Sequence, residues 1–133
     1  SANQSVMKNR VLEIVGGMSV QKKLSLYAAA LVAKENERVA PSPVVYDIYK
    51  ILCEGNNMKM YTQETVNSHI NKAETYGVLE SERSSGGFKS GVHLVFTFTE
   101  PVGAVLETLN EDSRLQDIPT EELGKVVKRR LRD

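Results

Sequence analysis

Reactive sulfur and imidazole groups are scarce in this 133-residue sequence, which has one cysteine, two histidines and no tryptophan. A single cysteine excludes an internal disulfide, and a Cys/His metal cluster would need more ligands than these residues provide. Cys53, His69 and His93 are also the only candidates for a Cys/His catalytic pair. Cys53 follows Leu52 on an apolar helical stripe, which is typical of a small core residue. We therefore expect a chain that is not an enzyme and that works in a reducing, cytoplasmic compartment.

Long hydrophobic runs are also missing. The longest candidate, residues 24–33, contains Ser25 and Tyr27 and is shorter than the roughly 18 residues that a membrane helix needs. Residues 1–10 have no apolar core of the kind found in a secretory signal peptide. We therefore expect neither a membrane partner nor a secreted protein.

Neither sign of charge is in surplus, since 17 basic residues balance 17 acidic ones. Nucleic-acid-binding domains usually carry a basic surplus, so contact with DNA would depend on a few well-placed groups rather than on the overall field. Residues 119–133 hold five basic and three acidic residues, which leaves the rest of the chain slightly acidic. The basic run at 125–132 is either a contact for DNA or an acidic partner, or an ordinary solvated helix face.

Hydrophobic spacing predicts mainly helices in the first half of the chain. Apolar residues recur at helical intervals in four segments, residues 4–15, 19–34, 42–55 and 62–76. Ser19, Ser42 and Thr62 suit the N-cap positions of the last three. Gly77 suits the C′ position, where glycine commonly ends a helix.

The second half of the chain adds a β-hairpin. Residues 78–83 and 92–99 predict two strands, joined by a glycine-rich tip. Helices are predicted again over residues 101–109 and 117–132. The expected fold class is α+β and mostly helical. The order helix, helix, turn, helix, hairpin is that of a winged helix-turn-helix with a two-stranded β-hairpin wing and extra flanking helices.

The helix at residues 62–76 is the predicted recognition helix, because the helix before the hairpin enters the major groove in this fold. With Val66, Ile70 and Ala73 turned toward the core, one face remains outward. It consists of Glu64, Ser68, Asn71, Lys72 and Thr75, flanked by Thr65 and Asn67. Hydroxyl, amide and ammonium groups suit base edges and phosphates. The alternative is a polar face without a partner, and the hairpin that follows directly favours DNA.

The hairpin tip, residues 83–91, is the second predicted contact. Its glycines allow backbone N–H groups to approach phosphate closely, and Arg83 and Lys89 supply positive charge. Phe88 is either an exposed aromatic that meets another surface or a side chain folded back onto the domain.

Four sequence runs carry a more specific signal. They are Gln21-Lys-Lys-Leu-Ser-Leu-Tyr-Ala, Val45-Tyr-Asp-Ile-Tyr-Lys-Ile-Leu-Cys53, Tyr61-Thr-Gln-Glu-Thr-Val66 and Ala73-Glu-Thr-Tyr-Gly-Val-Leu79. Together they resemble the C-terminal winged-helix domain of archaeal DNA replication initiators of the origin-recognition and cell-division-control type. The resemblance covers residues 12–115 and implies a domain that binds duplex origin DNA.

The resemblance also implies which residues hold DNA. On the recognition helix and the wing they are Thr62, Gln63, Thr65, Ser68, Asn71 and Lys72, and Arg83, Gly86, Gly87 and Lys89. Two positions depart from the family pattern. Glu64 stands where the family often has a basic residue, and Phe88 and Lys89 stand where the wing often has two arginines. Both departures weaken the expected attraction to phosphate.

Full-length members of that family carry an AAA+ ATPase module, which binds ATP or ADP with Mg²⁺. This sequence has no G-x-x-x-x-G-K-[ST] loop, so we expect no cofactor in it. Residues 1–18 are interpreted as a linker helix from the lid of that module. Residues 19–115 are the predicted winged-helix domain, and residues 116–133 a basic C-terminal helix.

Two other functions stay open on the sequence. A winged-helix transcription regulator has a similar order and size and usually dimerises through flanking helices, here residues 102–109 and 121–132. A protein-interaction module fits the zero net charge, with the replicative helicase or another initiator copy as its partner. Dimerisation in solution would favour the regulator.

Overall fold

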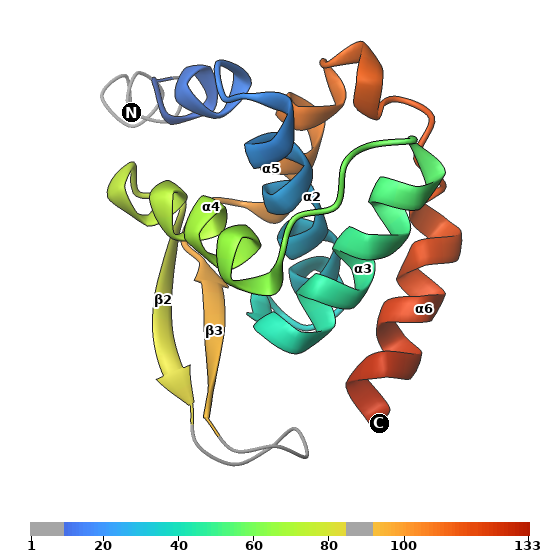
Figure 1. Cartoon of the computed structure of the whole chain (residues 1–133). Helices are drawn as coiled ribbons and strands as arrows, with labels where there is room; N and C mark the ends of the chain where they lie inside the picture. The colour runs from blue at the N-terminus through green and yellow to red at the C-terminus, as the bar shows by residue number, and fades with distance from the viewer. Residues whose placement is uncertain (1–9, 85–91) are drawn as a thin grey trace.

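The computed structural model describes residues 10–84 and 92–133 (Figure 1). A helical segment over residues 10–16 comes first. The elements that follow are α2 (Val20–Lys34), β1 (Val39–Pro41), α3 (Ser42–Gly55), α4 (Gln63–Thr75), β2 (Leu79–Ser84), β3 (His93–Phe98), α5 (Val102–Asn110), the 3₁₀ turn η1 (Ser113–Leu115) and α6 (Thr120–Arg132). The mostly helical α+β class is confirmed. Residues 85–91 of the hairpin tip, with Gly86, Gly87, Phe88 and Lys89, lie outside the described residues.

Helix α2 is the centre of the core. Every residue from 23 to 33 is buried, as expected of a helix with neighbours on all sides. α3, α4, α5 and α6 all contact it, and Figure 1 shows them arranged around it. Three consecutive small residues, Ala28, Ala29 and Ala30, lie at this centre and are fully buried. Larger side chains from the surrounding elements fill the remaining space, among them Tyr49, Phe96 and Ile70.

The wing strands belong to a three-stranded antiparallel sheet of order β1-β3-β2, so the predicted two-stranded hairpin is incomplete. In this sheet Phe96 of β3 lies opposite Ala40 on one side and Ser81 on the other. Because β1 has only three residues, it is too short to show an alternating pattern in the sequence. Phe96 and Phe98 are buried, which fixes the base of the wing to the core. Val92, the first residue of the strand predicted over 92–99, precedes β3 and is 59% exposed.

The predicted caps of α2 and α4 are confirmed. The Ser19 hydroxyl accepts a hydrogen bond from the Lys22 N–H at 3.5 Å, and the Thr62 hydroxyl accepts one from the Thr65 N–H at 3.3 Å. Each cap satisfies one of the N–H groups that have no partner inside the helix.

The predicted cap of α3 is wrong. Pro41 occupies the N-cap position without a side-chain cap, and Ser42 is the first residue of the helix. The reason is the unpredicted strand β1, which holds Pro41 in an extended conformation opposite Val95 of β3. The chain therefore turns into the helix one residue earlier than expected, and Ser42 is buried.

A buried ion pair joins α2 to the C-terminal elements. Lys23 Nζ lies 3.0 Å from Asp112 Oδ2, and the two side chains are 10% and 6% exposed. Asp112 also accepts hydrogen bonds from the Arg114 guanidinium, at 2.9 and 2.7 Å, and from its backbone N–H at 3.0 Å. One turn along α2, the Tyr27 hydroxyl donates to Asn110 Oδ1 at 3.0 Å. The bonds from Arg114, and then Lys23, hold the pKa of the Asp112 carboxyl well below its usual range.

Helix α6 packs Leu123 and Val127 into the core and turns its basic residues outward. Lys128 lies 3.7 Å from Glu35, and Arg130 lies 3.8 Å from Asp47. Part of the basic run at 125–132 is thus engaged in intramolecular pairs. Such exposed pairs contribute little to stability. The Lys128 and Arg130 side chains are 61% and 50% exposed, so both cations remain accessible.

None of the helices in residues 10–84 and 92–133 has the length and apolar character needed to cross a bilayer.

We predict that Asp112→Asn lowers the free energy of unfolding at pH 7 by about 2 kcal/mol, because it leaves Lys23 buried without its counter-ion. The pKa of Asp112 is lowered by folding, so its stabilisation is present above the unfolded pKa of about 3.9 and is lost as the pH falls below it. The difference between the two proteins should therefore shrink in acid. Urea denaturation at pH 7 and at pH 3 measures both effects. Asp117→Asn, at an exposed position, is the matched control, and equal losses in the two variants would contradict the prediction.

Candidate nucleic-acid interface

A buried polar network holds the connection between α3 and α4. The Tyr49 hydroxyl donates to Gln21 Oε1 at 2.9 Å and accepts the Tyr61 N–H at 3.0 Å. The Tyr46 hydroxyl donates to the Tyr61 carbonyl oxygen at 2.8 Å, and Gln21 Nε2 donates to the Lys59 carbonyl oxygen at 2.8 Å. Both backbone groups of Tyr61 are therefore held one residue before the α4 cap, which fixes the direction in which α4 starts.

Two side chains at this connection, Tyr49 and Cys53, are buried in their neutral, unreactive forms. Tyr49 is fully buried, and burial raises the pKa of its hydroxyl well above the usual range. Cys53 is 1% exposed, with Sγ 3.7 Å from the Lys59 carbonyl oxygen, and burial raises the pKa of its thiol. Cys53 is thus the core residue that the sequence predicted, because a reactive cysteine needs a lowered pKa and access to solvent.

The solvent-facing residues of α4 form three rows. Gln63, Asn67 and Asn71 follow one another at intervals of four and face the wing. Thr65, His69 and Lys72 lie on the other side, facing α2. Glu64 and Ser68 form the ridge between them and border both sides. Val66, Ile70 and Ala73 are buried beneath these rows, as predicted.

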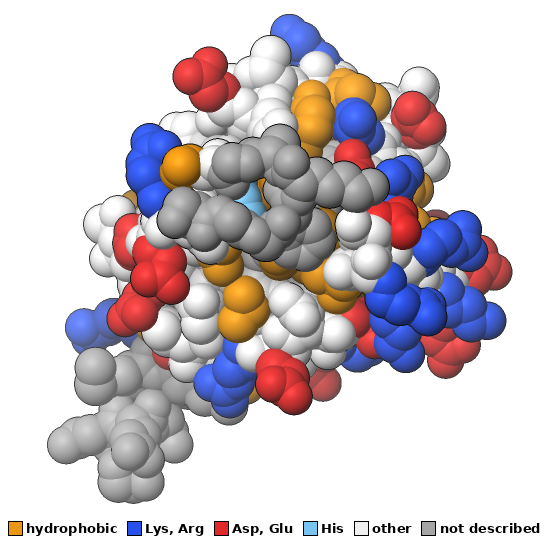
Figure 2. Space-filling model, turned by 90° about the horizontal axis from the view of Figure 1, so that it is seen from below, with side chains coloured by type: hydrophobic (Ala, Val, Ile, Leu, Met, Phe, Trp, Pro, Cys, Tyr) orange, Lys and Arg blue, Asp and Glu red, His pale blue; other side chains and the backbone are white. Residues whose placement is uncertain are grey.

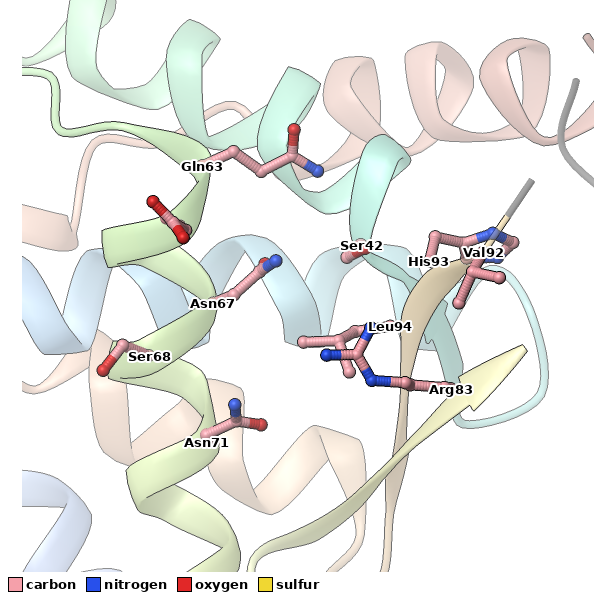
Figure 3. Close-up of a pocket in the computed structure, with 10 residues that line it drawn as sticks. Ser42, Gln63, Asn67, Ser68, Asn71, Arg83, Val92, His93 and Leu94 are labelled. Atoms are coloured by element: carbon pink, nitrogen blue, oxygen red, sulfur yellow. The ribbon is translucent and has the colours of Figure 1, made fainter. Parts of the chain in front are cut away.

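The wing-side row lines a groove of about 400 Å³ between α4 and the hairpin. Figure 3 shows Asn67 and Asn71 pointing into it from α4, while Arg83 points toward them from β2. Ser68 turns away from this group. Leu94 forms part of the groove between the two walls.

Two polar atoms in this groove have no protein partner. The Oδ1 atoms of Asn67 and Asn71 are both inaccessible to solvent, and within the described residues neither has a hydrogen-bond donor. A buried amide oxygen without a donor is destabilising by about 1–3 kcal/mol, so such atoms are usually satisfied by water or a ligand. In this side-chain arrangement the groove therefore holds two amide groups whose oxygens have no hydrogen-bond donor within residues 10–84 and 92–133.

The wing is held rigidly against the end of α4. Gly77 ends the helix at φ +80°, a left-handed conformation that suits glycine, as its predicted C′ role requires. The Thr99 hydroxyl donates to the Gly77 carbonyl oxygen at 2.7 Å. The Ser81 N–H and hydroxyl both donate to the Glu74 carboxylate, at 2.9 and 3.0 Å. These contacts set the width of the groove between α4 and β2.

The predicted contact residues lie in several different parts of the structure. Gln63, Ser68, Asn71 and Arg83 border the wing-side groove, whereas Thr65 and Lys72 lie on the α2 side of the helix. Thr62 is engaged in the cap and also donates to the Thr65 hydroxyl at 3.2 Å. Gly86, Gly87 and Lys89 lie outside the described residues. Their roles in binding DNA stay predictions.

Two residues with suitable chemistry were not among the predicted contacts. Asn67 lies beside Asn71 in the groove, and its spacing of four residues was a usable signal. Lys22 of α2 lies next to Lys72 of α4. These two lysines are brought together by packing between segments that are distant in the sequence, so no local pattern predicts that they share a place.

The charge around the interface is mixed. Glu80 and Glu82 are exposed on β2 beside Arg83, and Glu64 is exposed on the α4 ridge. In Figure 2 the Lys and Arg side chains gather on the side of the molecule where α6 lies in Figure 1. The face formed by α4 and the wing is therefore not a strongly positive surface. In the described parts of the chain, no group of His, Cys, Asp and Glu is arranged to hold a metal ion.

The sequence of this chain is similar to those of known DNA replication proteins. Residues 13–108 match the family model of the CDC6 C-terminal winged helix domain. The ORC1-type DNA replication protein 14 of Haloarcula marismortui is 34% identical, and the ORC1-type DNA replication protein 5 of Halobacterium salinarum is 31% identical. Both alignments cover 99% of this chain but only 32% of the relative, so the chain spans about a third of their length.

A solved structure of the Aeropyrum pernix ORC1 protein in complex with DNA has the same fold in part of its length. The TM-score is 0.76 at 23% sequence identity, over 86% of this chain and 30% of that one. The winged-helix architecture is therefore confirmed.

We predict that Tyr49→Phe lowers the free energy of unfolding by about 1–2 kcal/mol, because the Tyr61 N–H and the Gln21 side chain both lose a buried partner. Amide hydrogen exchange at Tyr61 should accelerate by more than the global loss of stability explains. Tyr76→Phe removes a hydroxyl from a side chain that is 45% exposed, and should change stability by less than about 0.5 kcal/mol. Unchanged exchange at Tyr61 would show that the network does not hold the connection.

Proposed function

The chain belongs to the family of CDC6 C-terminal winged-helix domains, and from that premise we propose that it binds duplex DNA. In the proposed complex α4 enters the major groove and the β2–β3 wing contacts the adjacent backbone. The major groove is about 12 Å wide and admits an α-helix. The relatives are ORC1-type replication proteins, so the DNA we propose is a replication origin, recognised with a sequence preference.

The observation that carries this proposal is the pair of Asn67 and Asn71 side chains, whose Oδ1 atoms have no hydrogen-bond donor in the part of the chain that the structure describes. A carboxamide offers an acceptor and a donor side by side, which matches the N6 donor and N7 acceptor of adenine in the major groove. Both amides lie on the outer surface of the helix that a winged-helix domain places in that groove. Because these oxygens are covered in the free chain, the two amides would turn outward on binding, where a base edge supplies the donors that the described residues do not.

Arg83 extends the same groove toward the backbone. It lies on the opposite wall from Asn67 and Asn71, at the end of β2 that leads to the tip (Figure 3). A guanidinium at this place suits a phosphate or the O6 and N7 atoms of guanine. The structure of the ORC1 relative in complex with DNA supports a DNA ligand for this fold.

Zero net charge shapes the expected binding. Non-specific attraction to phosphate should be weak, because the face of α4 and the wing carries the acidic residues Glu64, Glu80 and Glu82 as well as cations. Discrimination between sequences should then come mainly from the groove. A preferred duplex can be selected by this chain from a random library and compared with a scrambled duplex by fluorescence anisotropy over a series of salt concentrations. Tighter binding to the selected duplex, and its presence at replication origins, would support origin recognition.

We predict that Asn71→Ala weakens binding to the selected duplex by about 1–3 kcal/mol and leaves binding to the scrambled duplex nearly unchanged. The reason is that an amide on a base edge contributes only where the matching base is present. Thr75→Ala is the matched control, since Thr75 is exposed on α4 but does not border the groove. An equal loss on both duplexes would contradict base reading by Asn71. Failure of the wild-type chain to bind any duplex at low salt would refute the proposed function.

A further inference from the structure

Two lysines from different helices lie on the side of α4 that faces α2. Lys22 lies in the first turn of α2, and Lys72 lies in the last turn of α4. They border the same two grooves, with volumes of about 330 and 550 Å³. Packing of α2 against α4 therefore brings two ammonium groups to one place, on the side of the helix away from the wing.

Neither lysine is neutralised by the protein. The neighbouring Lys23 pairs with Asp112, and other cations pair with Glu35 and Asp47. Within residues 10–84 and 92–133, no such ion pair involves Lys22 or Lys72. In the smaller groove, whose lining has no acidic residue, the two cations raise the local potential and favour an anion from outside.

Both charges act on the imidazole of His69, which borders the larger groove together with the two lysines. Burial lowers the pKa of His69, and the positive charges of Lys22 and then Lys72 lower it further. The ring is held by the Ser25 hydroxyl, 3.3 Å from Nδ1, and lies edge-on to Tyr61. His69 is therefore a fixed reporter of the potential that the two lysines create.

The two grooves differ in how well they suit an anion. The larger groove is bordered by Glu64, whose carboxylate repels phosphate. The smaller groove has no acidic residue in its lining, which includes Ser19 at the start of α2 and Tyr76 after α4. The N-terminus of a helix of this length adds partial positive charge and free N–H groups to the same place.

We propose that Lys22 and Lys72 form a binding site for a backbone phosphate of duplex DNA in the smaller groove, beside Ser19. This site rests on the proposed function. A helix in the major groove has one sugar-phosphate backbone on each side. The wing and Arg83 lie on one side of α4 and the two lysines on the other, so the two sites would hold the two backbones that border the groove.

The test measures binding to the scrambled duplex as a function of salt, for the wild-type chain, Lys22→Gln, Lys72→Gln and the double variant. Each single variant should reduce the slope of log K against log salt by about 0.9, and affinity at 50 mM salt should fall about tenfold. Lys34→Gln is the matched control, because Lys34 is exposed at the opposite end of α2. It should leave the slope unchanged.

A second readout follows the His69 ring by NMR. Saturation with duplex should raise the pKa of His69 in the wild-type chain, because a bound phosphate offsets the two lysine charges. In the double variant the pKa should not respond to DNA. Wild-type slopes in both single variants, with normal DNA binding, would overturn this site and leave the proposed function intact. Absence of DNA binding by the wild-type chain would overturn both.

Discussion

The position of α4 depends on one buried hydroxyl. Tyr49 joins Gln21 of α2 to the backbone of Tyr61, so three segments distant in sequence meet at a single oxygen. Because this oxygen is buried, neither partner can exchange it for water without leaving a polar group unsatisfied. The connection before α4 has no regular secondary structure of its own. Its geometry therefore comes from this network rather than from a backbone ladder.

The network gives a physical meaning to the sequence runs that suggested the family. The first run supplies Gln21, the second supplies Tyr46, Tyr49 and Cys53, and the third begins with Tyr61. All of these residues contact the connection that leads into α4. The fourth run ends α4 at Gly77 and starts the wing. What the runs have in common is that they position α4 and the wing.

Local sequence patterns predicted the helices well. Prediction failed where an element is defined by its pairing with a distant segment of the chain. The caps at Ser19 and Thr62 and the left-handed Gly77 depend on neighbours within a few residues, and all three are confirmed. Strand β1 has only three residues and is defined by its distant partner β3, so neither it nor its effect on Ser42 was predictable. The site shows the same division. The inward face of α4 was predicted correctly from periodicity, whereas the pairing of Lys22 with Lys72 depends on how two helices pack.

A domain with zero net charge has no strong overall attraction to a polyanion. Its binding therefore depends on where a few suitable side chains lie. Among the described residues, the amide oxygens without donors are on one side of α4 and the lysines without an ion pair on the other, with Glu64 on the ridge between them. Glu64 also lies in the first turn of α4, where a negative charge is favourable to the helix. Glu64 therefore favours the stability of α4 while weakening attraction to phosphate. Such an arrangement favours discrimination between sequences over tight non-specific binding.

The most direct test of the account is to observe the side-chain amide groups of Asn67 and Asn71 by NMR while the selected duplex is added to the labelled chain. If both amides read base edges, their resonances should shift and their exchange with water should slow as the complex saturates. Contacts from these groups to base protons should appear in the same spectra. If both signals stay unchanged while the largest shifts fall on α6, then DNA does not occupy the groove between α4 and the wing, and the central claim is wrong.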